Sequence, residues 1–289
     1  SNEGTSNDKV GLDGNFAMTV SSGQASVSDV NTMSDFSTSG AITATISDGN
    51  IATLDDLTTS SADQLTITVT STTAGASQLT TVAGATGVNV TATAVETVTG
   101  TATQMDALLL VEGSGATDVN LDADYAITIN SGTATVTQAN AYGTATAGVV
   151  TATISDSAVA TLDNLTTANT DLLSITMAAE AVTAAQLIII NGATGSTVDA
   201  QAVTGITGTA AQFESVMDAE GASGDKINLD GDFTVSVSNG TTTAAQLAKI
   251  DAKTSKNVDA SAVTPERCDT ALIASALASA VPSLVAPTC

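Results

Sequence analysis

The chain has 289 residues, of which 43% are hydrophobic but only 2% aromatic, so aliphatic side chains must form nearly all of any core. Six basic residues stand against 30 acidic ones, a formal net charge of −24. That balance argues against nucleic-acid binding and against docking on an anionic membrane, because both need a basic surface. There is no histidine, which excludes Ser-His-Asp and Cys-His catalysis and histidine-ligated metals.

A long repeat runs along the chain. The segment Lys9–Phe16 returns at Asp118–Tyr125 and again at Lys226–Phe233, with a nearly constant offset. Matches at many other positions with the same offset make chance agreement implausible. We therefore divide 1–263 into long repeats near 9–117, 118–225 and 226–263.

A shorter unit of about 24 residues lies inside the long one. Segments such as Leu65–Val69 and Leu173–Met177 alternate apolar and polar residues, which predicts short strands. Candidate strands begin near residues 16, 42, 65, 88, 125, 149, 173, 198, 233 and 258. Asn191-Gly192 and Asn239-Gly240 are typical of turns.

Each unit has a second half built around a Gln-Leu-like pair, such as Gln78-Leu79, Gln186-Leu187 or Gln246-Leu247. Apolar spacing of three or four favours one or two helical turns there, with a preceding Thr as N-cap; loops or strands are the alternative. Units this short must share a core with their neighbours. The sequence thus predicts a β-rich solenoid of about ten stacked coils, each a short strand plus a short helical or loop segment.

The last residues, 264–289, break the repeat. Thr264-Pro265-Glu266 is typical of a helix start, and the Ala-rich run 271–278 continues it, which predicts a helical C-terminal cap. The same segment holds Cys268 and Cys289. Their spacing is unlike a redox motif, so we expect a structural disulfide that contributes roughly 3 kcal/mol and indicates an oxidising, extracytoplasmic location.

Acidic segments follow every fourth short unit and are the main candidates for a site. Clustered carboxylate and amide oxygens suit Ca²⁺, although the spacing is not that of an EF-hand. The alternative is a solvated acidic loop. The candidate ligands are Glu112, Asp118, Asn120, Asp122, Asp124, Glu220, Asp225, Asp230 and Asp232. Acids in the turns Ser47-Asp48-Gly49 and Ser155-Asp156 are expected only to cap those turns.

Enzymatic activity is not expected. Paired carboxylates can cleave glycosidic bonds, but a catalytic pair occurs once, whereas these acids recur with the long repeat. Sugar subsites also rely on aromatic platforms, and the chain has no tryptophan.

The phrases Gly100-Thr-Ala-Thr-Gln104 and Gly208-Thr-Ala-Ala-Gln212 resemble the Thr/Ala/Val-rich acidic repeats of large bacterial cell-surface proteins of the cyanobacterial type. The resemblance covers 1–263 and implies an extracellular structural or adhesive protein, such as the subunit of a surface filament or layer. The alternative is a receptor- or glycan-binding appendage module, such as a phage tail-fibre segment.

Charge distribution adds an expectation about partners. Five of the six basic residues lie in the last quarter: Lys226, Lys249, Lys253, Lys256 and Arg267. A basic end on one subunit and an acidic body on another favour head-to-tail self-association, or association with other surface proteins. No apolar run reaches the ~18 residues of a membrane span, so no membrane insertion is expected.

Overall fold

The computed structural model describes residues 14–37, 39–221, 223–224 and 226–265. The chain divides into two compact units. Unit 1 runs to Gly132 and includes Ala145–Gly148, whereas unit 2 comprises Thr133–Thr144 and the chain from Val149 onward. The predicted cap, 264–289, lies outside the described residues apart from its first two.

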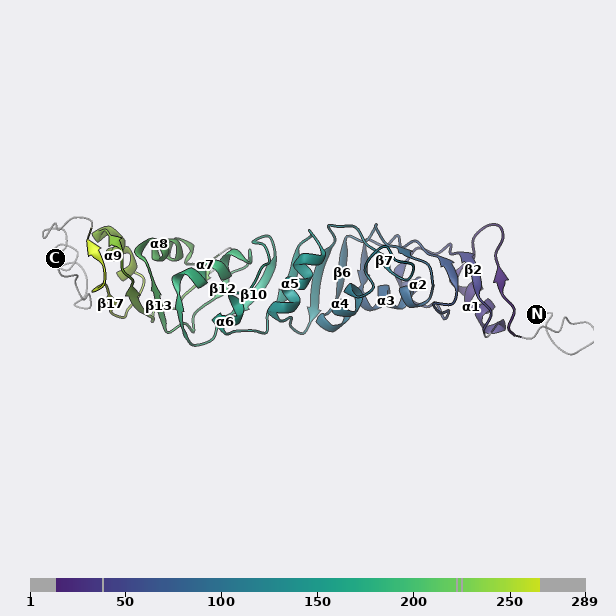
Figure 1. The fold of residues 1–289 in the computed structure, drawn as a ribbon, viewed down its shortest axis with the longest axis horizontal. Helices are drawn as coiled ribbons and strands as arrows, with labels where there is room; N and C mark the ends of the chain where they lie inside the picture. The colour runs from purple at the N-terminus through teal and green to yellow at the C-terminus, as the bar shows by residue number, and fades with distance from the viewer. Residues whose placement is uncertain (1–13, 38, 222, 225, 266–289) are drawn as a thin grey trace, which may run out of the picture. The chain divides into compact units, whose positions relative to one another are not determined.

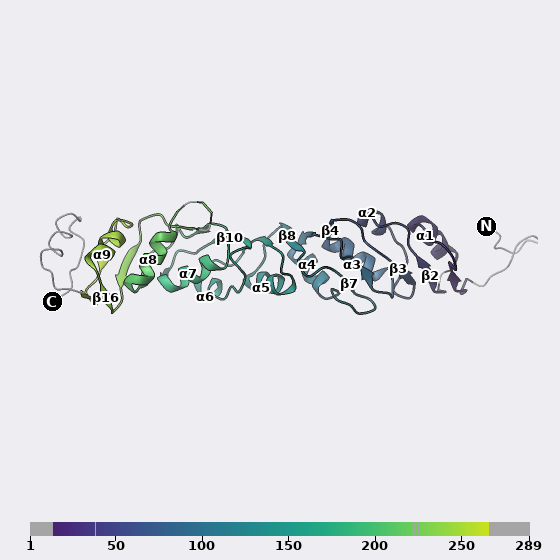
Figure 2. The ribbon, with the colours of Figure 1, turned by 90° about the horizontal axis from the view of Figure 1, so that it is seen from above.

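Unit 1 alternates short parallel strands with helices. Its strands form three groups, in the orders β1-β2-β3, β4-β6-β8 and β5-β7. Helices α3 and α4 pack against each other (Figure 2). The elements are β1 (Met18–Thr19), α1 (Val27–Phe36), β2 (Ile42–Thr45), α2 (Ile51–Leu54), β3 (Gln64–Thr66), β4 (Thr73–Gly75), α3 (Ala76–Gly84), β5 (Val90–Thr91), β6 (Thr97–Thr101), α4 (Ala102–Leu109), β7 (Val119–Asn120) and β8 (Ala126–Ser131).

Unit 2 repeats the same alternation, with strand orders β9-β10-β12-β14, β11-β13-β15-β17 and β16-β18. Helices α7, α8 and α9 follow one another in contact (Figure 1). The elements are α5 (Val136–Ala145, all but its last residue), β9 (Val150–Thr153), α6 (Val159–Leu162), β10 (Leu172–Thr176), β11 (Ala181–Thr183), α7 (Ala184–Gly192), β12 (Val198–Asp199), β13 (Gly205–Gly208), α8 (Ala210–Ala219), β14 (Ile227–Asn228), β15 (Thr234–Val237), β16 (Thr241–Thr242), α9 (Ala244–Asp251), β17 (Val258–Asp259) and β18 (Thr264–Pro265).

The predicted fold class, a β-rich solenoid, is wrong. The described residues contain nine helices besides parallel sheets, which is a mixed α/β architecture. The physical reason lies in the Gln-containing segments: their helices have eight to ten residues, more than the one or two turns expected and more than any described strand. The sequence prediction relied on the high β-propensity of the abundant Val and Thr residues. Helix capping and burial outweigh that propensity in these segments.

The helices start where the Thr-x-x-Gln pattern places them. In α4, α7, α8 and α9 the hydroxyl of an N-cap Thr accepts from the backbone N–H of the Gln three residues on. The Gln side chain in turn accepts from the N–H of that Thr, for example at 3.0 Å between Thr183 N and Gln186 Oε1. This reciprocal box satisfies two helix-start donors and confirms the predicted Thr caps.

Two pairs of apolar residues from successive predicted strands lie beside each other on neighbouring strands. Thr68 bridges Thr91 in parallel, which sets Ile67 beside Val90. Thr153 lies opposite Ser174 in the β9–β10 pair, which sets Ile154 beside Ile175. All four side chains are buried.

The leucines of the Gln-Leu pairs also lie where the sequence predicts. Leu79, Leu187 and Leu247 are buried, each on the inner face of its helix. Asn191-Gly192, however, ends helix α7 instead of forming a separate turn.

Candidate functional site

Small polar side chains make one recurring contact, found seven times within the described ranges. Each hydrogen-bonds, at 2.5 to 3.0 Å, to the backbone of a residue 21 positions earlier that lies at or next to a predicted strand start, and we call these contacts the backbone ties. The pairs are Ser37–Phe16, Asp63–Ile42, Thr86–Leu65, Thr146–Tyr125, Asp171–Val150, Thr194–Leu173 and Thr254–Phe233. The backbone partner lies at or next to the start of a predicted strand in every pair, so each tie anchors one strand start to the segment that leads into the next.

The chemistry of the ties follows the side chain. Thr194 Oγ1 accepts from Leu173 N at 2.9 Å and donates to Leu173 O at 3.0 Å, so one hydroxyl satisfies both polar groups of one residue. Asp63 accepts from Ile42 N at 2.7 Å and from Ser60 N at 2.9 Å. Because both carboxylate oxygens have N–H donors, this buried acid remains satisfied without a basic partner.

Sequence reasoning missed the ties. Their residue types, Ser, Thr and Asp, are common in turns, and no local motif marks them. The signal that could have found them is the constant spacing between each of these residues and the predicted strand start before it.

A second set of polar side chains caps helices of the preceding short repeat, about 20 residues earlier in the chain. Asp48 Oδ2 accepts from Val27 N at 2.8 Å, Asp156 Oδ2 from Val136 N at 2.7 Å, and Glu180 Oε1 from Val159 N at 2.6 Å. These acceptors meet the first N–H of α1, α5 and α6, where negative charge is favourable. The expectation that Asp48 and Asp156 cap only their own turns was therefore wrong.

The acidic segment of unit 1 is held by an amide. Nδ2 of Asn89 lies 2.9 to 3.2 Å from the carbonyl oxygens of Gly113, Gly115 and Asp118. Asp118 Oδ2 accepts from Gly115 N at 2.7 Å, and Asp122 Oδ1 accepts from Ala123 N at 2.8 Å. These predicted ligands thus shape the loop through local bonds.

The other predicted ligands of unit 1 contribute little to a shared cluster. Asn120 is half-buried, and its backbone carbonyl accepts from Ala92 N at 2.9 Å. The Asp124 side chain is exposed.

Glu112 has a different environment. Its Oε2 accepts from the Tyr125 hydroxyl at 2.8 Å. Burial raises the pKa of the Glu112 carboxyl, and the Tyr125 hydrogen bond opposes that shift only in part. Burial, together with the neighbouring Glu112, raises the pKa of the Tyr125 hydroxyl, so it stays a donor.

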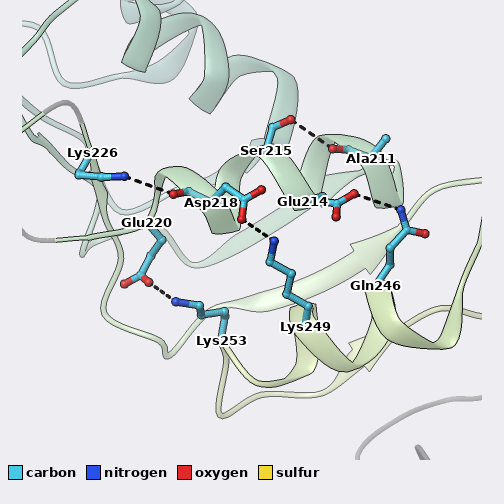
Figure 3. A network of polar contacts seen from close by, with 9 residues as sticks. All are labelled: Ala211, Glu214, Ser215, Asp218, Glu220, Lys226, Gln246, Lys249 and Lys253. Atoms are coloured by element: carbon cyan, nitrogen blue, oxygen red, sulfur yellow. Dashed lines mark hydrogen bonds and ion pairs between the residues drawn. The ribbon is translucent and has the colours of Figure 1, made fainter.

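The acidic segment of unit 2 is paired with lysines from the α9 region (Figure 3). Lys253 Nζ lies 2.5 Å from Glu220 Oε2, and Lys249 Nζ lies 2.5 Å from Asp218 Oδ1. On the same surface Gln246 Nε2 donates to Glu214 Oε2 at 3.3 Å. These contacts join α9 to α8 and to the loop that follows α8.

The two remaining described ligands of unit 2 lie in the next loop. Lys256 Nζ lies 2.8 Å from Asp232 Oδ1, and this hydrogen bond lowers the pKa of Asp232 and raises that of Lys256. Asp230 Oδ1 accepts from Asp232 N at 2.7 Å. Asp225 lies outside the described residues.

Comparison of the two segments shows a compensated exchange. Glu112 and Glu220 occupy the same place in successive long repeats. Tyr125, which hydrogen-bonds to Glu112, corresponds in the next repeat to Phe233, which has no hydroxyl. Lys253, which pairs with Glu220, stands where the earlier repeat has Ala145. A partly buried glutamate therefore keeps a donor in both units.

The calcium prediction gains no support from this geometry. Within the described part of the chain, no three Asp, Glu, His or Cys side chains gather closely enough to hold a metal ion. In unit 2 the acids instead face lysine ammonium groups, which compete with a cation, whereas Ca²⁺ takes about six to eight oxygen ligands. Calcium stays a prediction. The predicted disulfide between Cys268 and Cys289 lies outside the described residues.

Comparison with family models, with curated proteins and with solved structures finds no match for this chain. Among the helices of the described ranges, none combines the length and apolarity that a membrane span requires.

Proposed function

We propose that the chain is a non-enzymatic, extracellular structural or adhesive repeat protein. One observation carries the proposal: the polar side chains that recur along the chain are used to hold its own backbone. The same tie occurs seven times among the described residues, in both units. A catalytic group must act on a substrate at one place, whereas a contact repeated at successive strand starts serves architecture.

The extracellular location rests on the sequence. The predicted disulfide favours an oxidising compartment, and the resemblance to bacterial surface repeats points the same way. A net charge of −24 also keeps such a chain soluble at high local concentration.

Self-association is the second part of the proposal. Among the described strands, β1 and β17 each end a strand order, and edge strands are templates for pairing with another chain. The predicted charge route is weaker than the sequence suggests, because Lys249, Lys253 and Lys256 already have acidic partners within unit 2. We therefore assign head-to-tail contact to strand edges instead of free lysines.

Static light scattering over a range of protein concentration, followed by electron microscopy, tests this function. We expect the particle mass to grow with protein concentration, and end-to-end assemblies to appear in the micrographs. A strictly monomeric particle that binds glycans on an array would contradict it and favour the receptor-binding alternative.

A further inference from the structure

The turn between β15 and β16 carries an exposed Asn-Gly pair. Asn239 and Gly240 are exposed, and Gly240 has a φ of 151°. Gly240 O accepts from Thr264 N at 2.9 Å, so the turn lies beside the β16–β18 pair.

The equivalent Gly-containing segments of the two earlier repeats carry another residue before the glycine. Its glycines are Gly23, Gly132 and Gly240, which are equivalent positions of the long repeat, and all three have positive φ. The residue before the glycine is Ser22 in the first repeat and Ser131 in the second, but Asn239 in the third. The position therefore does not require asparagine, because serine precedes the positive-φ glycine in both earlier repeats.

We propose that Asn239 is a site of spontaneous deamidation. The backbone nitrogen of Gly240 attacks Cγ of Asn239, a C–N bond forms, the bond from Cγ to Nδ2 breaks, and ammonia leaves. Water then opens the five-membered imide at either carbonyl. The products are aspartate or an isoaspartyl linkage, with one water consumed, one ammonia released and no redox change.

Three features select this position. Glycine has no Cβ to shield its nitrogen from the attacked carbonyl carbon. The Asn239 side chain is exposed and lies in a turn, where the backbone can rotate toward the imide. Asparagine is thermolabile, and hyperthermophilic proteins contain fewer asparagines.

The chain contains a second Asn-Gly pair that serves as an internal comparison. Asn191-Gly192 lies in the last turn of helix α7, and Oδ1 of Asn191 is buried. Helical ψ holds Cγ of Asn191 away from the following nitrogen, so the same dipeptide is protected there. The fold, and not the dipeptide alone, sets which asparagine reacts.

Conversion changes the turn in two ways. It adds a negative charge, and the isoaspartyl form lengthens the backbone by one carbon atom just before Gly240. The turn belongs to the region where β16 pairs with β18, so the altered backbone weakens that edge.

The test is peptide mapping by mass spectrometry of the intact folded protein during incubation at physiological and at mildly alkaline pH. We expect the Asn239 peptide to gain the mass that replaces NH2 by OH, faster at the higher pH. It should also split into aspartyl and isoaspartyl forms, while the Asn191 peptide stays unchanged. Asn239→Ser, which copies the earlier repeats, should abolish the change and keep the circular dichroism spectrum.

Two results would overturn the proposal. One is an Asn239 peptide that stays intact in the folded protein while it deamidates in the denatured chain. The other is equal conversion of Asn191 and Asn239, because the fold would then exert no selection. Both results come from the unsubstituted protein and do not depend on how the variant folds.

Discussion

At the residue scale, Asp63 and Asp171 show how a chain with few basic residues buries carboxylates. Each lies inside its unit, and each accepts two backbone N–H bonds instead of pairing with a cation. Charge-assisted bonds of this kind offset the cost of removing a carboxylate from water. The acids therefore act as fixed acceptors for strand starts.

Thr194→Val tests a single tie. The substitution keeps the shape but leaves the N–H and C=O of Leu173 without the hydroxyl, so unfolding free energy should fall by about 1–3 kcal/mol. Chemical denaturation measures this loss. The matched control is Thr176→Val, at an exposed position of β10, the strand that contains Leu173; it should change stability by about 0.5 kcal/mol or less. Equal effects of the two variants would contradict the role of the tie.

Glu112 should make stability depend on pH. Burial raises its pKa in the folded state, so the folded chain holds this proton more tightly than the unfolded chain does. Its contribution is fully present below the ordinary glutamate pKa and is lost as pH rises through the raised value. Thermal melts across this pH window should show that loss in the unsubstituted protein and not in Glu112→Gln.

Two variants control this pH experiment. Tyr125→Phe should move the loss to higher pH, since the Tyr125 hydroxyl lowers the pKa of Glu112. Glu96→Gln, at an exposed glutamate of the same unit, should keep the pH dependence that Glu112→Gln removes. If Glu112→Gln retained the full pH dependence, Glu112 would not be its source.

At the element scale, the helices depend on the burial of one side. Leu187 is fully buried on α7, whereas Ile189, two residues on, is 49% exposed. Leu187→Ala should lower unfolding free energy by about 2–5 kcal/mol through lost burial and a residual cavity. Ile189→Ala should cost clearly less in the same denaturation experiment. A small loss for Leu187→Ala would mean that α7 is not packed as described.

The sequence predicted some helices and not others for a physical reason. In α4, α7, α8 and α9 the cap is local, so the Thr-x-x-Gln spacing marks each start. In α1 and α6 no Thr-x-x-Gln pattern marks the start, and the first N–H bonds to Asp48 or Glu180, a partner that short-range periodicity does not reveal. Helix α5 carries the pattern at Thr135 and Gln138, but it was not among the helices predicted from the sequence. These three helices, together with the length of the helices at the Gln-containing segments, make the architecture mixed α/β instead of β-rich.

The candidate site was predictable in composition but not in contacts. The repetition of the acidic segments is visible in the sequence. However, the partners of Glu112 and Glu220 depend on whether position 125 or its equivalent carries a hydroxyl. The donor to the glutamate changes from the Tyr125 hydroxyl to the Lys253 ammonium group, and this change becomes visible only in the three-dimensional structure.

At the scale of the whole molecule, calcium is the prediction that most needs a direct measurement. If the acidic segments bind Ca²⁺, the ion raises the melting midpoint according to its affinity for the folded chain, and a chelator lowers it. The sequence-based prediction expects that shift together with binding heat in calorimetry. An unchanged melting midpoint and no binding heat would contradict the calcium prediction.

The central claim is that recurring polar side chains hold the strand starts of this chain. Hydrogen exchange of backbone amides, followed by NMR, tests it most directly at Leu65 and Leu173, whose N–H groups donate to Thr86 and Thr194. We predict slow exchange at both amides, and faster exchange at Leu173 but not at Leu65 in Thr194→Val. If Leu173 exchanges at the same rate with and without the Thr194 hydroxyl, the ties do not hold the strand starts.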